Sequence, residues 1–184
     1  MIKLTLSLAL LAMLGCAPAP VAPERAAPVP TPPPAPTATP TPALDASWGA
    51  LRDLVGAWEG ASEQEQSKGT MTLTPDLGGQ VLVRRGTNDS PRGHHEDLTI
   101  IRRADGGTFR ADYFDNEGHV IRYLVQPRPG GVVFVSEIRP GEPRYRLTYT
   151  RADDATITGG FEVAPPGRPD EFAAYLSWRA RKIR

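Results

Sequence analysis

After residue 56, apolar and polar residues alternate with a period of two, and turn-forming residues interrupt the alternation about every ten positions. This pattern predicts about ten short strands: Ala57–Glu63, Gly69–Thr74, Gln80–Thr87, His95–Arg103, Thr108–Phe114, His119–Gln126, Gly131–Ile138, Arg144–Thr150, Thr156–Val163 and Glu171–Arg181. The turns between them are short, which makes consecutive strands antiparallel neighbours. An open sheet of this size has long exposed edges, so we expect an all-β, antiparallel up-and-down barrel.

The segment Leu44–Val55 has helical spacing instead. Asp45 or Ser47 can cap its start, and Gly56 ends it. Its apolar residues fall on one face at intervals of three and four: Trp48, Leu51, Leu54 and Val55. We therefore expect a short N-terminal helix that packs its apolar face against the barrel.

The first sixteen residues have the pattern of an export signal. Lys3 precedes an apolar run, Leu4–Leu14, which is too short to span a bilayer. Gly15-Cys16 follows directly and resembles the lipobox of bacterial lipoproteins, in which the cysteine is acylated and becomes the new N-terminus. The resemblance implies a signal peptide at residues 1–16 and a lipid anchor, such as palmitate, on Cys16. The alternative is an ordinary secretory peptide with an incidental cysteine.

Residues 17–43 form a tract rich in proline, alanine and threonine. Eleven of the chain's 20 prolines lie here, and proline cannot donate to a helix or a sheet. The tract is therefore expected to be a disordered spacer with polyproline II character, or alternatively a ligand for proline-recognising domains. Residues 44–184 remain as the folded domain.

Charge and cysteine content restrict the function of this domain. Lysines plus arginines equal aspartates plus glutamates, 21 of each, so no basic field favours nucleic acid. The single cysteine is Cys16, so the domain has no disulfide and no thiolate metal site.

One stretch carries a family resemblance. Leu51-x-x-Leu54-Val55-Gly56-x-Trp58-x-Gly60 resembles the entry segment of lipocalin-like (calycin) barrels, and the number of strands is similar to that of fatty-acid-binding and nitrobindin-like barrels. The resemblance implies a ligand-binding barrel. Nitrobindin-like proteins hold haem through a histidine near the C-terminus, and the last predicted strand has no histidine, so we expect no cofactor.

Strand parity gives the candidate ligand-binding residues. Tyr113, His119, Tyr123 and Tyr145 fall on faces that are otherwise apolar, so we expect them to point into one interior, with Trp58 near its closed end. Core packing is the alternative reading for these side chains. Any arginine that points inward could bind a ligand carboxylate, and the others should pair with Asp112, Glu137 or Glu162 outside: Arg84, Arg122, Arg144, Arg146 and Arg179.

Residues suited to metal binding or catalysis are sparse. His94-His95-Glu96-Asp97 is the densest group, but neighbours on a strand point to opposite faces, so we expect a solvated loop and no metal site. Ser90 and Ser136 lack a nucleophile motif, and we expect no enzymatic activity. A hydrolase or isomerase with unrecognised residues is the remaining alternative.

The sequence as a whole predicts a lipoprotein of the bacterial cell envelope. Its barrel would bind a small apolar or amphipathic molecule, while the N-terminal lipid would hold it to a membrane. Ala17, rather than aspartate, follows Cys16, and resemblance to the known sorting rule then implies the outer membrane, facing the periplasm. The alternative function is that of a non-enzymatic interaction or structural lipoprotein with a fully packed barrel.

Overall fold

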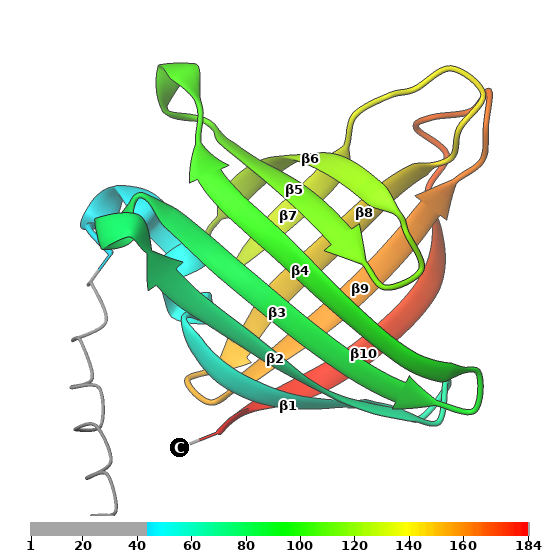
Figure 1. Cartoon of the computed structure of the whole chain (residues 1–184), viewed down its shortest axis with the longest axis horizontal. Helices are drawn as coiled ribbons and strands as arrows, with labels where there is room; N and C mark the ends of the chain where they lie inside the picture. Colours follow the sequence, from blue (N-terminus) through cyan, green and yellow to red (C-terminus); the bar gives the residue numbers. More distant parts are fainter. Residues whose placement is uncertain (1–43, 184) are drawn as a thin grey trace, which may run out of the picture. The chain divides into compact units, whose positions relative to one another are not determined.

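The computed structural model describes residues 44–183, which form a closed antiparallel β-barrel (Figure 1). Its ten strands are β1 (Gly56–Ser62), β2 (Ser67–Asp76), β3 (Val81–Ser90), β4 (Gly93–Arg103), β5 (Phe109–Asp115), β6 (Val120–Arg128), β7 (Gly131–Ser136), β8 (Arg144–Asp153), β9 (Thr156–Ala164) and β10 (Ala173–Ile183). Each strand pairs with its neighbours in the chain, and β10 also pairs with β1. The predicted signal peptide with Cys16 and the proline-rich tract lie outside the described residues.

The prediction of an all-β up-and-down barrel of about ten strands is confirmed. The strand ends differ slightly from those predicted. β2 and β4 begin earlier, at Ser67 and Gly93, and β10 begins later, at Ala173. The register between β9 and β10 shifts between Ala174 and Leu176, and such a bulge bends the strand locally.

The predicted N-terminal helix is confirmed as η1, a short 3-10 helix over Ala46–Leu54. Asp45 caps it by accepting a hydrogen bond from the Ser47 backbone N–H at 2.9 Å. The Trp48 ring lies 5.0 Å from the ring of Phe109 at the start of β5. The apolar side chains of η1 are buried in the barrel core: Trp48, Leu51 and Leu54. η1 therefore covers the end of the barrel at which β5 begins.

The Gly56-x-Trp58 motif joins η1 to β1. Gly56 has a φ of +131°, which L side chains rarely adopt, and a Cβ there would lie 2.8 Å from the Lys182 side chain. Trp58 is 1% exposed, and its indole N–H donates to the Leu54 carbonyl oxygen at 2.9 Å. The Lys182 ammonium lies 5.3 Å from the Trp58 ring centroid. The motif thus fixes the helix over the end of the barrel.

The two ends of the barrel differ in packing. The end covered by η1, here called the closed end, also carries the short helices η2 (Leu77–Gly79) and η3 (Asp105–Gly107). The opposite end, here called the mouth, is formed by the connections 63–66, 91–92, 116–119, 137–143 and 165–172. Side chains toward the closed end are buried: Trp58, Leu82, Ile101, Phe109 and Val132. The most deeply buried large apolar side chains of the interior therefore lie toward the closed end.

Candidate functional site at the mouth of the barrel

A belt of large side chains faces the interior near the mouth and keeps part of its surface exposed. These residues pack against the core from four strands: Tyr113, Ile121, Tyr145, Leu147 and Trp178. Tyr145 stacks on Phe161 of β9 with ring centroids 5.8 Å apart and an interplanar angle of 14°. Trp178 meets the edge of the buried Tyr149 ring at 6.1 Å. The mouth therefore presents apolar and aromatic surface inside the barrel.

An ion pair between Arg84 and Asp97 also lies inside the barrel. Arg84 is on the same face of β3 as the buried Leu82, and its guanidinium donates to the Asp97 carboxylate of β4. The two side chains are only 14% and 8% exposed. Gly86 is the cross-strand neighbour of Asp97, and a Cβ at this position would overlap the carboxylate. Glycine at position 86 therefore makes room for the ion pair.

Two buried polar groups that lack a well-formed hydrogen bond lie at this pair. The Arg84 Nε and the Tyr149 hydroxyl are buried, and neither has a hydrogen bond of good geometry within residues 44–183, although the Tyr149 oxygen lies close enough to the guanidinium to interact with it. Burial raises the pKa of Tyr149, although the nearby Arg84 opposes the rise. Burial likewise raises the pKa of Tyr123, and the neighbouring Tyr145 raises it further. Both phenols therefore stay protonated at neutral pH and can donate to an acceptor.

A second carboxylate, Asp115 of β5, lies directly opposite Asp97. Like charges in this position repel, so each needs a partner. Asp115 is 3% exposed and accepts hydrogen bonds from the backbone N–H groups of Glu117 and His119 at 3.0 and 2.9 Å, and from the Tyr113 hydroxyl at 3.1 Å. Burial alone would raise the pKa of Asp115, but the hydrogen bonds from His119 and Tyr113 lower it overall. Asp115 therefore stays ionised inside the rim.

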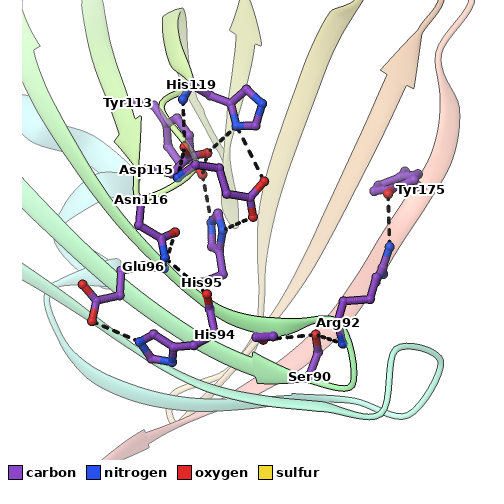
Figure 2. A network of polar contacts seen from close by, with 12 residues as sticks. Ser90, Arg92, His94, His95, Glu96, Tyr113, Asp115, Asn116, His119 and Tyr175 are labelled. Carbon is purple, nitrogen blue, oxygen red and sulfur yellow. Dashed lines mark hydrogen bonds and ion pairs between the residues drawn. The ribbon is translucent and has the colours of Figure 1, made fainter.

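His95 links β4 to this carboxylate network (Figure 2). Its Nε2 lies 3.1 Å from the Tyr113 hydroxyl, and its Nδ1 lies 3.2 Å from the Glu117 carboxylate. The backbone N–H of Asn116 donates to the Glu96 carbonyl oxygen at 3.0 Å, so the β5–β6 turn is held to β4 by main chain and side chain together. The rim of the mouth is thus polar on the side of β4 and β5.

The neighbouring His94 points the other way. Its ring nitrogens lie 2.7 Å from Asp89 and 3.0 Å from Glu96, and Figure 2 shows the His94 and His95 rings on opposite sides of β4. The alternation along the strand therefore places the two rings on opposite faces. The expectation of a solvated loop is wrong, because all four residues 94–97 belong to β4 and the Asp97 side chain is buried. Within residues 44–183, no group of three histidines, cysteines or carboxylates is placed to hold a metal ion.

The structure brings together three of the five residues predicted for the ligand site. Tyr113, Tyr123 and Tyr145 face the interior, as parity predicted. Trp58 lies near the closed end, also as predicted, and is buried beneath η1 rather than in the belt at the mouth.

The predicted orientation of His119 is wrong. Its side chain is 60% exposed, because β6 begins only at Val120 and His119 remains in the turn. Asp115 holds it there by accepting hydrogen bonds from its backbone N–H and from Nδ1, both at 2.9 Å. The alternation of a strand therefore does not extend to His119.

Sequence reasoning missed the pairing of Arg84 with Asp97 and the burial of Asp115. Arg84 was one of five arginines that could point inward, and the alternation with Leu82 on β3 was the available signal. Two of the expected outer pairs are present: Arg146 binds Glu162 at 2.6 Å, and Arg122 lies 4.0 Å from Asp112. Glu137 pairs instead with Arg110, at 2.7 Å, an arginine that was not predicted to take part.

The outer surface carries a separate open groove of about 1050 Å³ over β1, β2, β3, β9 and β10. Most of its lining side chains alternate with interior ones and so face outward. Small hydroxyl side chains form part of its lining, between charged groups of both signs: Thr70, Thr87, Thr158 and Ser177. The groove therefore combines polar and apolar surface, and it reaches the mouth at Glu63 and at Trp178, a member of the belt.

No known protein-family model matches the sequence. Within residues 44–183, none of the helices has the length and apolar character needed to cross a bilayer.

Proposed function

We propose that this protein is a binding barrel that takes up a small amphipathic molecule through the mouth. The observation that carries the proposal is the contrast between the two ends of the interior. Trp58 and its neighbours are fully packed at the closed end, whereas the belt at the mouth remains partly exposed. Apolar side chains that line a concavity, with a few polar groups converging on it, are typical of small-molecule sites.

The arrangement suggests how the ligand is oriented. Its apolar part packs against Tyr145, Leu147 and Trp178, whose side chains are only partly buried. Its polar end accepts hydrogen bonds from Arg84 Nε and from the Tyr149 hydroxyl, which have no hydrogen bond of good geometry within the described residues. An acceptor placed there removes the cost of leaving these buried donors unpaired, about 1–3 kcal/mol each. The ligand is therefore an amphipathic molecule with a hydrogen-bond-accepting or anionic end.

We further propose that the barrel is lipocalin-like, that it has no enzymatic activity, and that it belongs to a lipoprotein of the bacterial envelope. The support for the family is the Gly56-x-Trp58 entry segment together with the closed ten-stranded barrel. The support for the location is the apolar run that ends at Gly15-Cys16. In this proposal Cys16 carries the lipid, and the outer membrane, facing the periplasm, is the favoured site.

A neutral fluorescent probe, N-phenyl-1-naphthylamine, tests ligand uptake. Ile121 faces the interior at the mouth, while its neighbour Val120 is 49% exposed on the outer face. Ile121→Trp should fill the mouth and weaken probe binding at least about tenfold, the effect of about 1.4 kcal/mol. Val120→Trp adds the same bulk outside and should leave the affinity unchanged. If both variants bind like the wild type, the probe does not enter the mouth and the proposal is wrong.

The second candidate function is that of an interaction protein that works through its surface. The observation in its favour is the outer groove, whose mixed charges include Glu59, Lys68 and Arg179. It predicts that native mass spectrometry finds no small molecule on the purified chain. It also predicts that Lys68→Glu with Arg179→Glu abolishes capture of a partner while leaving probe binding unaltered.

A further inference from the structure

The contacts of Tyr113 and His95 at the mouth determine which of their polar atoms must carry a hydrogen. The Tyr113 hydroxyl has a single hydrogen, and it donates this to Asp115 Oδ2 at 3.1 Å. Toward His95 Nε2, 3.1 Å away, the phenol oxygen can then only accept. A hydrogen bond between them therefore requires a hydrogen on Nε2.

The other nitrogen of the ring has the same requirement. His95 Nδ1 lies 3.2 Å from a carboxylate oxygen of Glu117, and an ionised carboxylate can accept a hydrogen bond but cannot donate one. Both contacts can form together only if both ring nitrogens carry hydrogen, which is the imidazolium form. Neutral imidazole has one N–H and loses one of the two contacts.

The surroundings supply the negative charge that an imidazolium needs. The titratable and charged groups around His95 are Tyr113 and Asp115 of β5, Glu117 and His119 of the β5–β6 turn, Asp97 of β4, and Arg84 of β3. Arg84 is already paired with Asp97, and the residue directly across from His95 on β3 is the uncharged Asn88. The carboxylates of Asp115 and Glu117 therefore outweigh the positive charge near the ring.

We propose that the protonated ring of His95 ties the β5–β6 turn to β4 and thereby controls how fast a ligand leaves the mouth. This set of contacts, from His95 to Glu117 and Tyr113, is here called the clasp. The doubly protonated ring holds Glu117 and the Tyr113 oxygen together. When the ring loses a proton, it loses one of the two contacts. Tyr113, a member of the belt at the mouth, is then released on one side, and the ligand escapes faster. This regulation rests on the proposed binding function.

His94 provides a matched control on the outer face. Its two ring nitrogens also contact two carboxylates, of Asp89 and Glu96, and these hydrogen bonds raise its pKa. The ring is 48% exposed and does not contact the β5–β6 turn through its side chain. His94 therefore titrates beside the clasp without closing it.

The first experiment measures dissociation of N-phenyl-1-naphthylamine from the full chain by stopped flow at pH 5.5 and 7.5. The probe is uncharged at both values, so only the protein titrates. We expect dissociation about threefold faster at pH 7.5, the effect of one ion pair at a partly exposed site. His95→Gln should dissociate at one rate at both pH values, whereas His94→Gln should keep the threefold difference. Equal wild-type rates, or loss of the difference in His94→Gln, would overturn the clasp.

The second experiment separates failure of the clasp from failure of ligand binding. Nitrogen-15 NMR of the histidine rings needs no ligand, and the chain has only three histidines. We expect His95 to show two protonated ring nitrogens at pH 5.5. We also expect amide exchange at Asn116, between pH 5.5 and 7.5, to accelerate several-fold more in the wild type than in Glu117→Gln. The glutamine side chain can donate to a neutral ring, so this variant keeps the contact at both pH values. A neutral His95 ring at pH 5.5 overturns the clasp even if the probe binds; absence of probe binding with a protonated ring overturns only the binding function.

Discussion

Asp97→Asn gives the most direct test of the interior described above. The substitution keeps the shape of the side chain and removes the charge that balances Arg84. Both side chains are nearly enclosed, because Asp97 is only 8% exposed and Arg84 only 14% exposed. Solvent therefore screens the guanidinium charge much less than it screens the charge of a surface arginine. The variant therefore leaves a positive charge inside the barrel with only neutral neighbours on β3 and β4.

The size of the effect follows from this burial. Removing one member of a buried ion pair costs about 3–5 kcal/mol, whereas exposed pairs contribute about 0–1 kcal/mol. Arg84 keeps some exposure, so we expect Asp97→Asn to lower the free energy of unfolding by about 3 kcal/mol. Replacing both residues by apolar ones, Arg84→Met with Asp97→Val, should bring the stability back to within about 1 kcal/mol of wild type, because no unpaired charge remains.

Urea denaturation followed by tryptophan fluorescence measures these differences. The matched control is Glu171→Gln, which removes the partner of Arg168 in a pair whose side chains are 62% and 63% exposed, and which should cost less than about 1 kcal/mol. If Asp97→Asn costs no more than this control, the interior around Arg84 is as wet as the surface. The enclosure of the Arg84–Asp97 pair inside the barrel would then be refuted.

Two further predictions concern the carboxylate at the rim and the N-terminus. Hydrogen bonds hold the pKa of Asp115 below its usual value, so this group stabilises the fold above about pH 4 and loses that effect as the pH falls further. Asp115→Asn should therefore be about 1–2 kcal/mol less stable than wild type at pH 7, and chemical denaturation across pH should show this difference shrinking as the pH falls below about 4. Cys16→Ser should abolish incorporation of radiolabelled palmitate by cells that make the full chain, and labelling that persists would contradict the lipid anchor.

Much of the barrel could be predicted because strand alternation and turn chemistry are local. The inward orientation of Tyr113 and Tyr123 was predicted from parity alone, and both face the core, together with Ala111 and Val125 on the same faces. The alternation is a property of the extended backbone, so it is reliable wherever a strand is continuous. The change from helical spacing to alternation also marks where the N-terminal helix ends and the first strand begins.

The failure at His119 has an equally local cause that parity cannot detect. Alternation assumes that the strand has begun, but Asp115 accepts two backbone N–H groups of the turn and delays β6 until Val120. An aspartate that starts a four-residue turn ending in glycine was a visible signal of turn chemistry. The pairing of Arg84 with Asp97 is different, because it depends on the register between β3 and β4. Register is fixed by the whole sheet and cannot be read from either strand separately.

The two sides of the barrel interior carry different kinds of side chain near the mouth, and the stability of the fold alone does not explain this difference. Near the mouth, β3, β4 and β5 contribute Arg84, Asp97 and Asp115, whereas β8 and β10 contribute Tyr145 and Trp178. A buried ion pair can usually be replaced by apolar side chains without loss of stability, and two carboxylates directly opposite each other cost stability unless both are neutralised. A barrel whose only requirement was to fold would do as well with leucine and valine on that side. A molecule that is apolar along one flank and polar at one end needs the opposite arrangement, with an aromatic wall facing a wall of fixed charges and donors. The polar side of the mouth, which costs stability, therefore supports the proposed binding of an amphipathic ligand.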